Sequence, residues 1–237
     1  MRCKVLEVKN LRARYGDSLV LDGVGIEVAA GQGVALLGRN GAGKTTLLKS
    51  IVGGGPTVDG TLRFMGGDLR QIGTHARARS GLALVPEDRR IFSHLTVEEN
   101  LLLARHASGP RGTLPLQEAY GLFPALAELR TRMGNQLSGG QQQILAVARA
   151  LMSRPKCMLL DEPTEGVAPL LVQQMAEQVN RARQQQGAAL LLAEQNLWFS
   201  RRCTDYVFVI DTGRIVFEGD WNHFDAHPEI ADRYLAV

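Results

Sequence analysis

The fold of this chain is decided by one stretch, Gly38-Arg39-Asn40-Gly41-Ala42-Gly43-Lys44-Thr45-Thr46. It has the pattern of a phosphate-binding loop, in which a glycine is followed by four residues and then by Gly-Lys-Thr. The apolar run 34–37 before it predicts a buried parallel strand, and residues 46–51 after it predict the first turns of a helix. Such a loop works only between a strand end and a helix start, so the flanking sequence supports the motif.

The chemistry of the loop follows from its residue types. Its glycines let the backbone curl, so that successive N–H groups point inward and the helix dipole adds positive potential. We expect Lys44 to reach the β- and γ-phosphates of a nucleotide and the Thr45 hydroxyl to be a Mg²⁺ ligand. The alternative is an ordinary glycine-rich turn, which the number of matching positions disfavours. The stretch therefore predicts binding of a nucleoside triphosphate.

Length and composition limit the class of protein. The chain has 237 residues, which suits one large α/β domain with room for a small inserted subdomain. Its net charge of +3 is too small to favour nucleic-acid binding. No run is long enough for a membrane span, and Met1-Arg2-Cys3-Lys4 lacks the apolar core of a signal peptide. We therefore expect a cytoplasmic protein that can lie against a membrane.

Alternating apolar and polar residues near the loop predict half-buried antiparallel strands. These are at 5–8, at 20–28, where Asp22-Gly23 resembles a turn, and at 60–64. Tyr15 lies between the first two, and its ring is either plain surface or a flat face for stacking on a purine.

The character of the sequence changes from residue 87 to about residue 135, where helical patterns occur without strand signals. Thr96 and Glu99 have the spacing of a capping box at a helix start. Residues 116–133 predict another helix. We interpret 87–135 as a helical subdomain inserted into a single domain that spans 1–237.

Ser138-Gly139-Gly140 opens a helix that we expect to run to about Ser153. Ser138 is a plausible N-cap, and the two glycines predict a bare, approachable helix N-terminus. Such a helix start is a second anion site, which one polypeptide folding around a single nucleotide would not need.

Asp161 and Glu162 follow an apolar strand predicted at 156–160. Uncompensated buried charge is costly, so adjacent acids at this place point to function. Beside a phosphate-binding loop, we expect Asp161 to hold Mg²⁺ through water and Glu162 to orient and deprotonate the attacking water. The alternative is the solvated start of a loop.

The last part of the chain predicts a helix from Pro169 to Gly187 and a core strand at 188–193 that leads to Glu194-Gln195-Asn196. A hairpin at 206–217 and a C-terminal helix at about 222–235 follow.

In this order and spacing, the three motifs resemble those of the ATP-binding subunit of ABC transporters. The resemblance runs from Tyr15 to the C-terminus. It implies an α/β P-loop NTPase (ABC ATPase) core with an N-terminal antiparallel β subdomain and the inserted helical subdomain. Four short segments resemble one branch of this family in particular, the second ATPase of importers for branched-chain (hydrophobic) amino acids. The segments are 85–92, 95–101, 160–169 and 194–196. Importers of urea and short amides share much of this pattern.

The resemblance implies an ATPase that couples ATP hydrolysis to uptake, with ATP and Mg²⁺ as cofactors. The resemblance implies that Tyr15 stacks on adenine and that Val20 lies beside the base. The residues implied around the phosphates are Gly38, Arg39, Asn40, Gly41, Ala42, Gly43, Lys44, Thr45 and Thr46. Ser138, Gly139 and Gly140 are implied to close on the γ-phosphate held by the opposite subunit. Asp161 lies near Mg²⁺, and Glu162 is the implied general base.

The resemblance also implies partners. They are a second ATPase subunit, in a hetero- or homodimer, two membrane permease subunits and, indirectly, a periplasmic binding protein. The permeases would contact the helical subdomain and residues 87–93. The resemblance implies a peripheral position at the cytoplasmic face of the inner (plasma) membrane. It does not imply a nucleic-acid partner.

Three positions depart from the general ABC pattern. Glu87 stands where a glutamine near Mg²⁺ and the attacking water is usual, and a carboxylate is a capable Mg²⁺ ligand. Gln195 replaces a histidine, so it can donate a hydrogen bond to the γ-phosphate but cannot carry charge. Ala168 replaces an aspartate that makes a contact across the dimer. These departures match the amino-acid branch, and they put equal hydrolysis at both ATP sites in doubt.

Two rival functions remain. A soluble ABC-type ATPase acting on ribosomes or DNA usually has two fused ATPase units or a long coiled coil between the loop and the Ser-Gly-Gly motif. Here about ninety residues separate the two motifs, without sustained heptads. An exporter ATPase is the other rival. The transported molecule does not touch this subunit, so the sequence does not specify it.

Overall fold

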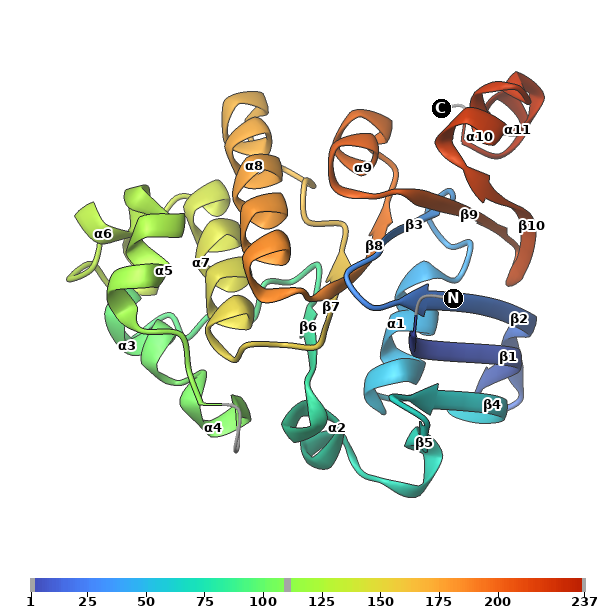
Figure 1. Ribbon diagram of the computed structural model, residues 1–237, viewed down its shortest axis with the longest axis horizontal. Helices are drawn as coiled ribbons and strands as arrows, with labels where there is room; N and C mark the ends of the chain where they lie inside the picture. Colours follow the sequence, from blue (N-terminus) through green and yellow to red (C-terminus); the bar gives the residue numbers. More distant parts are fainter. Residues whose placement is uncertain (1–2, 109–111, 236–237) are drawn as a thin grey trace.

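The computed structural model describes residues 3–108 and 112–235. Two β-sheets pack around one central helix, and a group of shorter helices lies at the opposite end of the molecule (Figure 1). The fold is mixed α/β, with one antiparallel and one mixed sheet, as the sequence predicts.

The antiparallel sheet has the order β2-β1-β4-β5 and consists of β1 (Lys4–Tyr15), β2 (Ser18–Ala29), β4 (Thr57–Phe64) and β5 (Gly67–Asp68). Strands β1 and β2 form a hairpin that ends with Tyr15 paired to Ser18. The turn predicted at Asp22-Gly23 is wrong. Gly23 has a positive φ of 76° inside β2, where the register with β1 shifts and the strand continues.

The mixed sheet has the order β10-β9-β3-β8-β7-β6. Its strands are β3 (Gly33–Leu37), β6 (Leu82–Val85), β7 (Cys157–Asp161), β8 (Ala189–Glu194), β9 (Tyr206–Asp211) and β10 (Arg214–Asp220), of which only β10 runs antiparallel to its neighbour. Every residue of β3, β7 and β8 is buried, which explains their unbroken apolar runs. The carboxyl ends of these parallel strands meet at one edge, where α/β folds bind ligands.

Helix α1 (Lys44–Val52) lies between the two sheets, with Leu47, Leu48 and Ile51 fully buried (Figure 1). Its last carbonyls are held by Arg77 of α2 (Thr74–Ser80), which follows β5 and a 3₁₀ turn, η1 (Leu69–Gln71). The Arg77 guanidinium is buried and donates to the carbonyl oxygens of Ser50 and Ile51, both at 2.9 Å. Burial lowers the pKa of this group.

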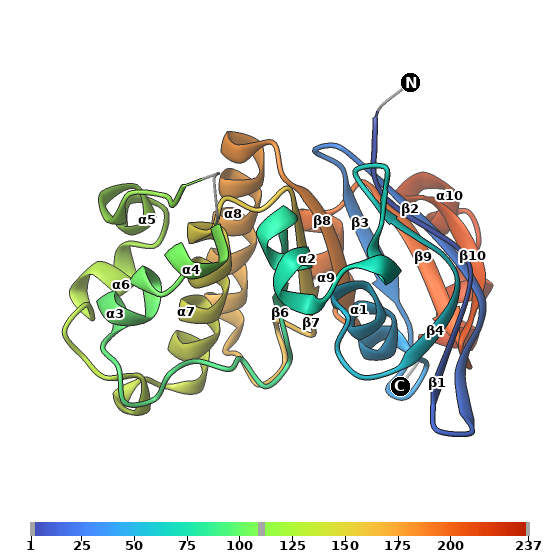
Figure 2. The same cartoon turned by 90° about the horizontal axis from the view of Figure 1, so that it is seen from below.

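Helices α7 (Gly139–Met152), α8 (Pro169–Gln186) and α9 (Leu197–Cys203) cover the face of the mixed sheet opposite α1. Figure 1 shows α9 across β8 from α1, and Figure 2 shows α7 and α8 across β6 and β7 from α1. The alternation along β7 shows the two layers, because Met158 and Leu160 belong to the core under these helices and Leu159 to the core around α1. The strands that end at the candidate site are therefore covered on both faces.

The region predicted to be helical contains α3 (Val97–Leu102), α4 (Arg105–Ser108), α5 (Leu116–Leu122), α6 (Pro124–Glu128) and a 3₁₀ turn, η3 (Gly134–Gln136). The capping box is confirmed: Glu99 N donates to Thr96 Oγ1 at 3.2 Å and Thr96 N donates to Glu99 Oε2 at 2.8 Å. The single helix predicted at 116–133 is wrong, because Pro124 lacks the N–H that would continue α5. The limits 87–135 of a separate subdomain stay a prediction.

The C-terminal helix predicted at 222–235 is two helices, α10 (Trp221–Asp225) and α11 (Pro228–Tyr234). Pro228 begins the second helix, where its missing N–H costs nothing. Phe224 of α10 packs with Val207 and Val209 of β9 in a small separate core.

Candidate nucleotide site

The phosphate-binding loop runs from the end of β3 to the first residue of α1, as predicted. Gly43 is the N-cap of α1 and has φ of 112°, a conformation that L side chains rarely adopt. A Cβ at Gly38 would lie 2.4 Å from the carbonyl oxygen of Ile210. Glycine is thus required at one position by backbone conformation and at the other by close packing.

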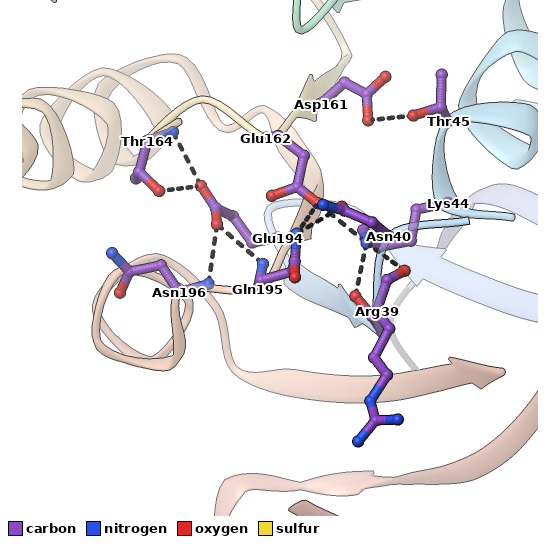
Figure 3. A network of polar contacts seen from close by, with 11 residues as sticks. Arg39, Asn40, Lys44, Thr45, Asp161, Glu162, Thr164, Glu194, Gln195 and Asn196 are labelled. Carbon is purple, nitrogen blue, oxygen red and sulfur yellow. Dashed lines mark hydrogen bonds and ion pairs between the residues drawn. The ribbon is translucent and has the colours of Figure 1, made fainter. Parts of the chain in front are cut away.

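Lys44 points into the curl of its own loop. Its Nζ lies 2.6 Å from the carbonyl oxygen of Gly38 and 3.0 Å from that of Arg39. A third contact joins Nζ to Glu162 Oε1 at 3.0 Å (Figure 3). All three ammonium donors therefore face oxygen atoms, and the side chain is only 5% exposed.

Thr45 and Asp161 meet beside the lysine, where Thr45 Oγ1 donates to Asp161 Oδ1 at 3.1 Å (Figure 3). Burial raises the pKa of Asp161 to about 6, against the effect of this hydrogen bond, and the nearby charges of Glu162 and Glu87 add to the rise. Such hard oxygen donors, with negative charge that lacks compensation, fit Mg²⁺. Within the described residues no cluster of three His, Cys, Asp or Glu could hold a metal alone, so nucleotide oxygens would have to complete the ligand set.

Glu162 lies under the loop in a strained conformation, with φ of 45° and 8% exposure. Its backbone N–H donates to the carbonyl oxygen of Ala193 at 2.9 Å, which fixes it to β8. Positive φ at a residue other than glycine is uncommon and clusters at functional sites. In this conformation the carboxylate contacts Lys44.

Gln195 lies between the loop and Glu162. Its Nε2 donates to Asn40 Oδ1 at 2.7 Å and to Glu162 Oε1 at 3.3 Å (Figure 3). The side chain thus joins the two groups that the sequence assigns to phosphate binding and to catalysis.

Glu194, the residue before Gln195, is a site residue to which the sequence analysis assigns no role. It is 1% exposed and is hydrogen-bonded to Thr164 and to the backbone after β8. The signal that could have found it is the one that identified Asp161-Glu162, a carboxylate at the end of an apolar strand.

Tyr15 and Val20 are less closely tied to the loop. Tyr15 is 42% exposed at the tip of the β1–β2 hairpin, and its ring lies beside Gly55. It helps to line a cavity of about 480 Å³ together with Lys49, Pro86 and residues after α1. Val20 is half-buried, with its carbonyl oxygen against Gly213. Their contact with an adenine base stays a prediction.

The start of α7 is capped as predicted, with Gln141 N donating to Ser138 Oγ at 3.3 Å. Two side chains lie close to its glycines. A Cβ on Gly139 would lie 3.0 Å from Arg89 Nη1, and one on Gly140 would lie 2.6 Å from Leu171 Cδ1. The two glycines thus make room for neighbouring side chains, and the use of this helix end as an anion site stays a prediction.

Glu87 lies in the turn after β6 and is exposed. Its charge adds to the rise in the pKa of Asp161, after burial and the charge of Glu162. Contact of Glu87 with Mg²⁺ stays a prediction.

Comparison with known proteins agrees with this geometry. The family model for ABC transporters matches residues 21–165. The high-affinity branched-chain amino acid transport ATP-binding protein BraG of Pseudomonas aeruginosa is 37% identical, covering 98% of this chain and 99% of BraG. The probable branched-chain amino acid transport ATP-binding protein LivF of Archaeoglobus fulgidus is 31% identical, covering 98% and 99%. The lipopolysaccharide export system ATP-binding protein LptB of Escherichia coli is 32% identical, covering 90% of each chain.

A solved structure described as the ATP binding subunit of an ABC transporter has a TM-score of 0.80 and 30% identity, covering 97% of this chain and 94% of that chain. The fold and site define a nucleotide-binding ATPase, and the chain belongs to the ABC transporter family. As such a subunit it binds ATP, works with membrane permeases and is associated with a membrane. No helix within 3–108 and 112–235 is both long and apolar enough to cross a bilayer.

Proposed function

We propose that this chain hydrolyses ATP with Mg²⁺ to drive uptake of branched-chain (hydrophobic) amino acids through an ABC importer. The observation that carries the catalytic part is the 3.0 Å contact between Lys44 Nζ and Glu162 Oε1. It brings a phosphate-binding cation and a carboxylate base to one point at the mouth of the loop. Hydrolysis needs both groups within reach of the γ-phosphate.

The loop binds the phosphates through its own backbone and Lys44. Phosphate oxygens take the place of the Gly38 and Arg39 carbonyl oxygens around the ammonium group. The N–H groups at the start of α1 donate to the same phosphates, and the helix dipole favours their negative charge.

Thr45, Asp161 and Glu87 would hold Mg²⁺. When bound there, the ion supplies positive charge that neutralises the phosphates during transfer. The assignment is supported by the raised pKa of Asp161, which comes first from burial and then from the nearby charges of Glu162 and Glu87, since a cation bound there would offset this cost of ionisation.

Glu162 acts as the general base that takes the proton of the attacking water. Gln195 holds Glu162 and the loop residue Asn40 at a fixed separation through its amide nitrogen. This amide is neutral at every pH, so Gln195 itself does not titrate.

The active unit contains two ATPase subunits, identical or different. Ser138, Gly139 and Gly140 of one subunit close on the γ-phosphate held by the other, so hydrolysis is coupled to closure of the dimer. Two permease subunits contact the region 87–135, a periplasmic binding protein delivers the substrate, and the complex works at the cytoplasmic face of the inner membrane.

The substrate rests on the similarity to BraG and LivF, whose names give branched-chain amino acid transport. Urea or short amides are the second candidate, because their importers share the 164–166 motif. The test is uptake of radiolabelled leucine, urea and an amide in a deletion strain complemented with the wild-type chain or with Lys44→Ala. Loss of leucine uptake that only the wild-type chain restores is the expected result. Unchanged uptake of all three in the deletion strain, without a redundant transporter, would refute the importer function.

A further inference from the structure

Glu194 is the last residue of β8 and one of the most deeply buried carboxylates of the described chain, with 1% exposure. It has no direct contact with the loop residues 38–46 among the hydrogen bonds of the described chain. Burial raises the pKa of Glu194, against the effect of its hydrogen bonds. A buried acid is costly, so its contacts have to account for its presence.

The two carboxylate oxygens of Glu194 serve two different segments. Oε1 accepts from Thr164 N at 2.9 Å and from Thr164 Oγ1 at 2.7 Å. Oε2 accepts from Gln195 N and from Asn196 N, both at 3.0 Å (Figure 3). We call this set of four hydrogen bonds the Glu194 bracket.

Both ends of the bracket adjoin Glu162. Thr164 lies two residues after it, and Gln195 reaches it through Nε2 at 3.3 Å. The backbone of Glu162 is held by Ala193, the residue before Glu194. Glu162 keeps its positive φ of 45° because the segments around it are fixed in this way.

We propose that Glu194 is a positioning residue for ATP hydrolysis, which holds Thr164 and Gln195 on either side of Glu162 through the bracket. This inference rests on the proposed role of Glu162 as general base. The bracket also joins two segments of the chain. One follows Glu162 toward Ala168, where the second ATPase is expected to lie, and the other contacts the phosphate-binding loop.

The bracket requires a carboxylate rather than any buried polar group. Four donors converge on it, and an ionised carboxylate accepts at both oxygens, whereas an amide accepts at one and donates at the other. Glu194→Gln therefore keeps the shape and removes the charge, but its NH₂ group has to face N–H donors of one segment. One end of the bracket is lost.

The test measures single-turnover hydrolysis, ATP affinity and thermal stability of Glu194→Gln in the full chain assembled with its transporter partners. We expect the rate to fall at least tenfold, while affinity for a fluorescent ATP analogue stays within threefold. The control for general destabilisation is Trp221→Phe in α10, which loses the hydrogen bond from Nε1 to the carbonyl oxygen of Thr204 and should keep its rate. Thr164→Val, which removes one donor at the other end, should slow hydrolysis, and Thr164→Ser should restore it.

The result is compared with Glu162→Gln and with the double variant. If Glu194 acts through Glu162, the double variant is no slower than Glu162→Gln alone, because the two changes remove the same contribution. A rate within threefold of wild type for both Glu194→Gln and Thr164→Val overturns the inference, as does a loss of affinity equal to the loss of rate. If Glu162→Gln itself slows hydrolysis less than tenfold, the proposed base is wrong, and the two failures are thereby distinguished.

Discussion

Lys44 determines what the loop can bind, because its three donors define the volume in which anionic oxygens fit. We predict that Lys44→Ala weakens ATP binding at least about tenfold, since a hydrogen bond to a charged group contributes roughly 1.5–3 kcal/mol. The measurement is titration with a fluorescent ATP analogue. Lys156→Ala, which removes an exposed lysine before β7, is the matched control. Equal affinity of the two variants would contradict the assignment of the loop.

Asp161 gives the stability of the protein a pH dependence. Its pKa rises from 3.8 to about 6 on folding, so the folded chain holds this proton more tightly than the unfolded chain. Stability from this group is therefore greatest at low pH and falls as pH rises from roughly 4 to 7. We predict that Asp161→Asn removes this fall and stabilises the protein above pH 7 by up to about 3 kcal/mol.

The measurement for Asp161 is urea unfolding without nucleotide at pH 5 and pH 8. Asp232→Asn, which removes an exposed carboxylate of α11, should leave the difference between the two pH values as it is in the wild type. If Asp161→Asn also leaves that difference unchanged, Asp161 is not the titrating group.

At the scale of single residues, the sequence motifs predicted much of the site. Lys44, Thr45, Asp161 and Glu162 lie together because their motifs contain the chemistry and the strand ends on which it is placed. Glu194 has the same signal, a carboxylate at the end of an apolar strand, but its role could not be predicted, since it comes from donors thirty residues earlier in Thr164 that only the fold brings near. The neighbours of Gly139 and Gly140 could not be predicted for the same reason.

At the scale of elements, the turn between β9 and β10 supports the phosphate-binding loop. Gly213 N donates to the carbonyl oxygen of Ala42 at 2.9 Å, and Asp22 N donates to the carbonyl oxygen of Gly213 at 2.9 Å. A Cβ at Gly213 would lie 2.0 Å from the carbonyl oxygen of Val20, and φ there is 74°. The turn, β2 and the loop are therefore joined through one glycine.

We predict that Gly213→Ala destabilises the protein by about 1–3 kcal/mol and also weakens ATP binding, because Ala42 has to move. Gly66→Ala is the matched control, since Gly66 has a similar φ of 83° and nothing within 4 Å of its Cβ position. The measurements are urea unfolding and titration with the ATP analogue. Equal effects of the two substitutions would show that the loop does not depend on this turn.

The helices and strands formed where the period of the apolar residues predicted them, and proline and glycine marked where they end. The predictions that were wrong concern interruptions. Pro124 and Pro228 each divide a helix that periodicity alone would continue, whereas Gly23 is absorbed within β2. A local pattern does not tell whether a breaker ends an element or bends it, because neighbouring strands decide whether pairing continues.

At the scale of the whole molecule, the start of α7 is predicted to act on the nucleotide of another subunit. We therefore predict that the isolated chain hydrolyses ATP at least about tenfold more slowly than the assembled transporter does. The measurement is phosphate release at several protein concentrations, with and without the partner subunits. A monomer that hydrolyses at the full rate would show that one chain completes its own site.

Arg77 affects which helices unfold together in local unfolding. Its guanidinium holds the last carbonyls of α1, so the end of that helix cannot fray without leaving a buried charge unpaired. Helices α1 and α2 should therefore exchange their backbone amide hydrogens with solvent in one cooperative event. The last turn of α1 then remains protected for as long as α2 stays docked, although β4 and β5 lie between the two helices in the sequence.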